Sequence, residues 1–115
     1  MLRGDIRWAD PGRGWPGEVA GRRPAVIVSN DGANAAAVRS GRGVVTIIPL
    51  TSNVATVHRF QVLLDASECG LPENSKAQVE QVRAVSVARI GPRLGTVPAP
   101  LMRQIDEALR VHLGL

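Results

Sequence analysis

The pattern of apolar and polar positions predicts a series of short strands followed by one helix. Apolar runs rich in Val and Ile, separated by glycine, proline and polar residues, are typical of strands. We expect strands at Leu2–Ala9, Pro24–Ser29, Val44–Leu50 and Phe60–Asp65, then a bent one over Lys76–Val87 and a short one closing Arg89–Val97.

The last segment changes to helical spacing. The positions that fall on one face of a helix there are Leu101, Ile105, Ala108, Leu109 and His112. Pro98 and Pro100 suit a first helical turn, where a missing N–H costs little. The sequence therefore predicts a helix from Pro98 to Leu113 that packs this stripe on the strands, with His112 as a helix-end side chain rather than a ligand.

Between the strands lie polar connections of unequal length. Asp10–Arg22 is rich in glycine and proline, and its length indicates a mobile functional or disordered loop. Asn53–Arg59 is a second exposed loop. Asn30–Arg42 is expected to be a connection with one helical turn at Ala33–Val38, and Ala66–Ser75 a turn-rich connection.

Strands followed by one terminal helix predict a fold that is mainly β. We expect a single domain over residues 1–115, folded as a small, partly open antiparallel barrel with an appended C-terminal helix. No apolar stretch is long enough to span a membrane, and the charged N-terminus does not resemble a signal peptide. A cytoplasmic location is therefore expected. Cys69, the lone cysteine, can form no internal disulfide and is expected to be a bystander in a polar loop.

Charge adds one clue about partners. The formal net charge is +4, and the 14 basic residues comprise one lysine, Lys76, and otherwise arginine. Arginine offers a planar fork that grips phosphate at two points, so a polyanionic partner is plausible. A GC-rich coding sequence, which favours arginine codons, accounts for the same bias equally well.

Several kinds of catalytic site are absent from the sequence. There is no glycine-rich phosphate loop, no dinucleotide fingerprint and no G-x-S-x-G nucleophile motif. Histidine and cysteine show no metal-ligand spacing, so we expect neither a metal nor a cofactor. Any chemistry must then come from ordinary side chains.

Polar residues at the ends of two apolar strands supply a candidate site. Arg23 precedes the run that starts at Pro24, and Thr51-Ser52 follow the run Val44–Leu50. If those strands are neighbours, a guanidinium and two hydroxyls meet at the barrel rim and can hold a phosphodiester without a metal. Singly, each has a plainer interpretation: a surface arginine paired with a carboxylate, and turn hydroxyls bonded to backbone.

RNA is the phosphodiester that this trio suits, because its 2′-OH is an internal nucleophile. The protein then has to stabilise the charge on the phosphorane and move two protons. Arginine is a poor base, with an ordinary pKa above about 12. A carboxylate or His58 is chemically more natural than Arg23, so the residues leave the proton acceptor open.

Four motifs, in this order and spacing, resemble the MazF/PemK/Kid family of toxin endoribonucleases, especially its mycobacterial and actinobacterial members. They are RGDIRWAD near the N-terminus, RRPAVIVSND, VVTIIPLTSN and EQVRAV. The resemblance implies an SH3-like or CcdB-like barrel that acts as a homodimer. It also implies sequence-specific, metal-independent cleavage of single-stranded RNA to 2′,3′-cyclic phosphate and 5′-OH ends, which arrests translation and growth. A cognate MazE-like antitoxin with an acidic tail is implied as partner.

The same resemblance assigns roles by position. Arg23 and Thr51 match the catalytic arginine and threonine, Ser52 extends the hydroxyl pair, and Glu80 lies where the Kid branch has a catalytic aspartate. Gln78 replaces an arginine of that branch, which weakens a Kid-like acid–base scheme. The two loops are expected to bind RNA through Arg13, Trp15, Arg22, His58 and Arg59.

Trp15 has two interpretations, since it could stack on a splayed base or cap the barrel core. Two rivals to the nuclease are a CcdB-like toxin that binds gyrase without catalysis and a plain RNA- or peptide-binding barrel. The first needs an aromatic residue near its C-terminus, and this chain ends His112-Leu113-Gly114-Leu115.

Overall fold

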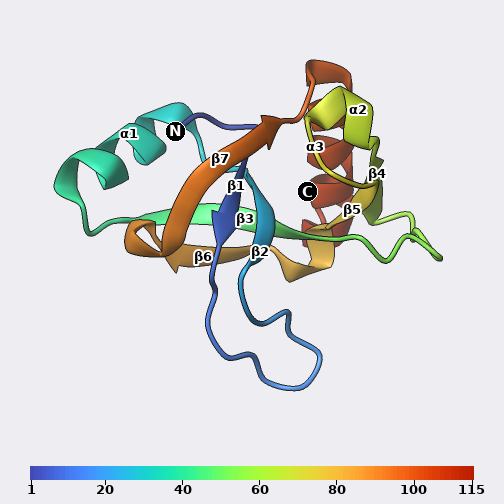
Figure 1. Ribbon diagram of the computed structural model, residues 1–115, viewed down its shortest axis with the longest axis horizontal. Coiled ribbons are helices and arrows are strands. Elements are labelled where there is room, and N and C mark those ends of the chain that lie inside the picture. The colour runs from blue at the N-terminus through green and yellow to red at the C-terminus, as the bar shows by residue number, and fades with distance from the viewer.

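The computed structural model describes residues 1–115, which form a seven-stranded antiparallel sheet flanked by helices (Figure 1). The strands are β1 Asp5–Ala9, β2 Arg23–Ile27, β3 Val44–Thr51, β4 Gln61–Leu64, β5 Ser75–Gln78, β6 Arg83–Ser86 and β7 Ile90–Thr96. The helices are α1 Asp31–Ser40, α2 Ala66–Cys69 and α3 Ala99–Leu113, with single 3₁₀ turns η1 Val79–Gln81 and η2 Val87–Arg89. The predicted mainly β fold with a C-terminal helix is confirmed.

Strand β3 organises the sheet. The order is β4-β5-β3-β2-β1-β7, and β6 also pairs with β3. Val44–Ile47 of β3 pair with β6 and Ile47–Pro49 pair with β2, whereas the end of β3 pairs with β5, Thr51 opposite Lys76. Because one strand shares its length among three partners, the sheet curls into a partly closed barrel instead of lying flat.

Side-chain alternation along the strands gives the sheet two apolar faces. Ile48 and Leu50 of β3 join a core of 13 buried residues that includes Ile105 of α3. Val45 and Ile47 join a second cluster of 7 on the other face, covered by Ala37 of α1. The two helices thus occupy opposite sides of the sheet, as Figure 1 shows.

Helix α1 is longer than predicted. The expected single turn at Ala33–Val38 is a helix of 10 residues, Asp31–Ser40. The side chain of Asn30 caps its start by accepting from the Ala33 N–H at 2.8 Å, and Gly41 ends it in the left-handed region at φ 71°. The error arose because α1 buries a small and a polar side chain, so it has no large apolar stripe.

The polar connection before β5 contains a buried residue. Cys69 ends α2 with 1% of its surface exposed, so its expected place in a polar loop is wrong. Gly95 of β7 lies so close that a Cβ there would come within 1.9 Å of the Cys69 carbonyl oxygen. Only glycine allows β7 and α2 to pack at this distance.

The bend predicted in Lys76–Val87 is confirmed, because η1 separates β5 from β6.

Helix α3 packs Ile105 and Ala108 into the main core, as its spacing predicts. His112 is exposed, however, because the last turn runs past the edge of the sheet, so its place on the packed stripe is wrong. The N-terminal segment holds this helix, since Arg3 pairs with Asp106 at 2.5 Å and donates from Nε to the Val28 carbonyl at 2.8 Å. The apolar stretches of the helices fall short of what a membrane crossing requires.

Candidate functional site

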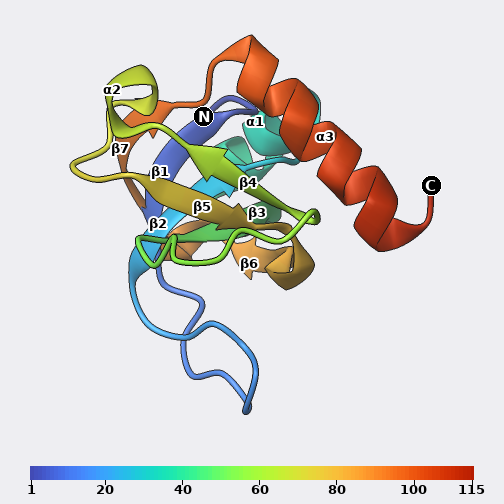
Figure 2. The same ribbon diagram turned by 90° about the vertical axis from the view of Figure 1, so that its right-hand side faces the viewer.

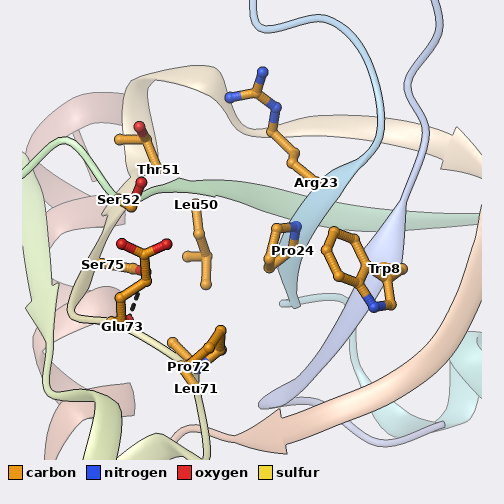
Figure 3. A pocket seen from close by; sticks show the side chains of 10 residues that line it. All are labelled: Trp8, Arg23, Pro24, Leu50, Thr51, Ser52, Leu71, Pro72, Glu73 and Ser75. Atoms are coloured by element: carbon orange, nitrogen blue, oxygen red, sulfur yellow. Dashed lines mark hydrogen bonds between the residues drawn. The ribbon is translucent and has the colours of Figure 1, made fainter.

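Neighbouring strand ends bring Arg23 and Thr51 together. β2 and β3 pair with Ala25 opposite Pro49, and the same antiparallel register, continued by two residues, sets Arg23 across from Thr51. Both residues and Ser52 line one cavity (Figure 3). The guanidinium and the two hydroxyls that the strand ends predict at one rim do share this site.

The Arg23 guanidinium has unused hydrogen-bonding capacity. Its Nη2 donates to the Ala20 carbonyl oxygen at 2.8 Å, while its Nε is buried without a partner. Neither of the two ion pairs in the chain includes it, so the plainer interpretation of a surface arginine paired with a carboxylate does not hold. A buried donor without a partner is costly unless a ligand or water completes it, which suits an anion site.

The hydroxyls beside it keep their protons available. Thr51 Oγ1 accepts from the Asn53 N–H at 3.2 Å, the turn contact expected of a strand-ending threonine. Its own O–H is then free to donate. Ser52 is exposed. Lys76 lies opposite Thr51 but does not donate to the cavity. Its Nζ donates instead to the Thr56 carbonyl at 2.5 Å, which holds the Asn53–Arg59 loop.

The cavity that these groups share has a volume of about 250 Å³. Its apolar walls are Trp8, Pro24, Leu50, Leu71 and Pro72. Its remaining polar walls are Glu73 and Ser75, from the connection into β5. In Figure 3 the Glu73 carboxylate points into the cavity below Ser52, while the Arg23 guanidinium extends along the opposite wall. No sequence pattern predicts Glu73, because it lies in an aperiodic turn.

Glu80 and His58 lie outside this cavity. Both Glu80 carboxylate oxygens accept from Gln61 Nε2, at 3.2 and 2.8 Å. A second cavity, of about 400 Å³, is lined by Glu18, Glu80, Gln81, Val82, Arg83 and Ala84. His58 is exposed beside Arg59, with its ring stacked on Phe60 at a centroid distance of 5.2 Å. The structure therefore places these candidate residues around the Arg23 cavity, not in it.

The long loop between β1 and β2 carries the other predicted contacts. Figures 1 and 2 show it reaching away from the sheet. Trp15 is 79% exposed, so the interpretation in which it caps the barrel core is wrong for this chain. Arg13 is also exposed. Arg22 lies over the Trp8 ring at 4.4 Å from its centre, a cation–π contact with a residue that lines the cavity.

The Gln81 side chain helps to hold that loop to the body of the molecule. The Gln81 amide accepts from the Val19 N–H at 3.2 Å and donates to the Gly17 carbonyl at 2.9 Å. A single side-chain amide therefore both accepts from and donates to the loop backbone, as the backbone of a neighbouring strand would.

The structure contains no group of three His, Cys, Asp or Glu side chains that could hold a metal ion.

Fold and site together define a class: a small antiparallel barrel with a cavity lined by an arginine and two hydroxyls, and an arginine-bearing loop beside it. Comparison with known proteins narrows this class. The chain belongs to the family of PemK-like, MazF-like toxins of type II toxin-antitoxin systems, whose sequence profile matches residues 2–113.

Individual relatives agree with this assignment. The endoribonuclease MazF9 of Mycobacterium tuberculosis is 51% identical over 118 residues, covering 100% of this chain and 98% of that protein. Among solved structures, a mycobacterial endoribonuclease in complex with its cognate antitoxin has a TM-score of 0.77 at 25% identity, covering 100% of this chain and 96% of that one. MazF of Deinococcus radiodurans has a TM-score of 0.81 at 23% identity, covering 100% and 97%, and supports the shared barrel fold.

Proposed function

We propose that this chain is the toxin of a type II toxin-antitoxin system and acts as a sequence-specific, metal-independent endoribonuclease on single-stranded RNA. Its family and its relatives named as endoribonucleases support the activity. The site supports the mechanism, because it offers charged and neutral donors to a phosphate. Such an enzyme arrests translation and growth, and we place its action in the cytoplasm, where its RNA substrates are.

The chemistry needs no cofactor. The 2′-oxygen of the nucleotide before the cut bonds to phosphorus as the bond from phosphorus to the 5′-oxygen breaks. The 2′-hydroxyl proton leaves to a base, and the departing 5′-oxygen gains a proton. The products are a 2′,3′-cyclic phosphate and a 5′-OH end. Arg23, Thr51 and Ser52 donate hydrogen bonds to the phosphate oxygens as negative charge grows on the phosphorane.

One observation carries this proposal: the buried Nε of Arg23 has no partner and lies in a cavity shared with two hydroxyls. A fixed donor that is already oriented stabilises a developing charge without reorganising during the reaction. Of the three candidate proton acceptors, Arg23 alone lines this cavity. We therefore assign Glu80 and His58 supporting roles near the RNA path.

The test is cleavage of a long single-stranded RNA in the presence of EDTA. We expect the wild type to cut, and Arg23→Ala and Thr51→Ala each to lose about 10²–10³-fold in kcat, the usual effect of removing one such donor. Glu80→Gln and His58→Ala should keep most of the activity. Arg103→Ala, an exposed arginine on α3, is the matched control and should cut like the wild type.

Two results would contradict the mechanism. Intact RNA after incubation with the wild type would refute nuclease activity and leave the plain RNA-binding barrel. Cleavage that EDTA abolishes would show that a metal takes part. The gyrase-binding alternative is not favoured, since the comparisons lead to endoribonucleases.

We further propose the assembly that the family implies. The chain acts as a homodimer and is held inactive by a cognate MazE-like antitoxin, as the mycobacterial relative solved with its antitoxin suggests. An acidic antitoxin segment suits the arginines Arg13, Arg22 and Arg23, because it offers the same negative charge as RNA. In the free toxin these residues, with Trp15, His58 and Arg59, are available to RNA.

A further inference from the structure

The Arg23 cavity contains a carboxylate that phosphate chemistry does not require. Glu73 lines the cavity with Arg23 and Thr51, and its carboxylate points inward (Figure 3). Its main-chain oxygen accepts from Ser75 Oγ at 3.2 Å, but its side-chain oxygens have no hydrogen bond and belong to neither ion pair. Two strong acceptors are therefore free at the place where RNA is proposed to bind.

A free carboxylate beside a phosphate site is unfavourable for a polyanionic ligand, because like charges repel at short range. The cost is offset only where the ligand brings hydrogen-bond donors to the same place. In RNA those donors are the amino and ring N–H groups of the bases, which proteins read on splayed-out bases. Glutamate accepting from a base amino group is an established form of such recognition.

The rest of the cavity suits a planar group of that kind. Pro24, Leu50, Leu71 and Pro72 form apolar walls, and the Trp8 ring stands at one side with Arg22 over it. The volume of about 250 Å³ is below the range of about 300–1,000 Å³ typical of pockets for drug-sized ligands. A single nucleobase therefore fits better than a larger group, with an aromatic ring available for stacking.

We propose that this cavity binds the base that flanks the scissile phosphate, and that Glu73 selects a base with an exocyclic amino group. The inference rests on the proposed nuclease function and deepens it. Guanine, adenine and cytosine each present an amino group, and guanine adds a neighbouring ring N–H that matches both carboxylate oxygens. Uracil has no amino group and presents two carbonyls that repel the carboxylate, so it is disfavoured at this position.

The test uses short RNAs that differ only in the base on either side of a mapped cut. The kcat/KM for each is measured with the wild type, with Glu73→Gln and with Glu73→Ala. We expect the wild type to prefer amino-bearing bases over uracil at one flanking position. Both variants should reduce that ratio by roughly 5- to 150-fold, the range for loss of a good base contact. Glu68→Gln, an exposed glutamate on α2, removes the same charge and should keep the wild-type ratio.

The outcomes separate the two proposals. If the wild type cuts no RNA, the proposed function fails and base selection fails with it. If the wild type cuts but both Glu73 variants keep its base ratios, Glu73 does not select the base. If the folded variants lose activity equally on every RNA, Glu73 serves proton transfer instead. Because the side chain is exposed and bonds to nothing, the variants should unfold at the wild-type temperature.

Discussion

The cavity sets a positive and a negative side chain at different walls, and their tasks differ accordingly. Arg23 has donors that suit any phosphate, whereas Glu73 has acceptors that suit only certain bases. Contacts to phosphate position a nucleic acid and contacts to bases specify it. Affinity and sequence preference should therefore be separable in this chain by single substitutions.

Cys69 is the buried side chain whose ionisation is most disturbed. Burial, followed by the neighbouring Glu68 and Asp65 carboxylates, raises the pKa of the Cys69 thiol. The neutral thiol should therefore react slowly with iodoacetamide in the native protein and quickly in urea. The rate of alkylation, followed by mass spectrometry, checks this, and equal rates in the two states would contradict the buried position.

The same shift has a definite effect on stability. Because the folded-state pKa is above the ordinary thiol value of about 8.5, the stabilising effect is complete below that pH and is lost as pH rises through the folded pKa. Cys69→Ala has no thiol, so its unfolding free energy lacks this dependence on pH. Its deficit in unfolding free energy should thus be larger near neutrality than in strong alkali.

The strand-end residues were predictable from the sequence and Glu73 was not. Alternation in β2 and β3 shows where each strand stops, so the apolar pattern alone suffices to place Arg23 and Thr51 at the rim. The direction of Glu73 depends on how the chain leaves α2 through Gly70, at φ 74°, and packs beneath β3. Such long-range packing leaves no periodic signal in the sequence.

The β1–β2 loop is irregular, and one side chain holds its middle. Gln81 bonds to the backbone of Gly17 and Val19, across a separation of more than 60 residues. Because these two contacts come from a single side chain, this part of the loop is expected to open locally at low cost while the sheet stays intact.

Removing that anchor should loosen the loop without unfolding the barrel. In Gln81→Ala, the amide of Val19 should exchange with deuterium roughly 5- to 13-fold faster, since a lost hydrogen bond of roughly 1–1.5 kcal/mol corresponds to that factor. Hydrogen exchange read by mass spectrometry on the Asp10–Arg22 segment measures it. Gln104→Ala on the exposed face of α3 is the control. Unchanged exchange in Gln81→Ala would show that the loop is held elsewhere.

The helices differ in how far the sequence predicts them. Large apolar side chains at helical spacing mark α3, and its observed bounds lie within one residue of the expected ones. In α1 the buried face consists of Asn34 and Ala37. Asn34 is fully buried and donates from Nδ2 to the Ser29 carbonyl at 2.9 Å. A helix that docks by a polar contact has no amphipathic pattern, although its Asn30 cap and Gly41 stop are recognisable locally.

The arginines of the molecule are spread over loops, strands and helices. The net charge of +4 is small, so binding of RNA depends on where the charge lies. Arg13 and Arg22 lie on the β1–β2 loop, and Arg23 lines the cavity at the start of β2. We expect these arginines to bind one RNA together, and only the folded chain brings the loop and the start of β2 close enough for that.

This distribution predicts a steep dependence of RNA binding on salt. If those three arginines each neutralise one phosphate, log K should fall with log salt at a slope of about −2, or roughly twentyfold for a fourfold rise in concentration. Fluorescence anisotropy with a labelled single-stranded RNA and the slow-cutting Thr51→Ala variant measures the slope, within a time in which the RNA stays intact. Arg13→Ala should reduce its magnitude by about 0.7. An affinity that does not change with salt would exclude this binding mode.

Lys76 offers a way to detect unfolding of the chain. It is the single lysine among 14 basic residues, it is 9% exposed, and its amine is engaged by the Thr56 carbonyl. A lysine-specific protease therefore has one possible cleavage point, in the middle of the sheet and closed to it in the native state. Each cut molecule records one opening event and yields two fragments of distinct mass. Amine-directed dyes, for the same reason, should mark the N-terminus of the native protein alone.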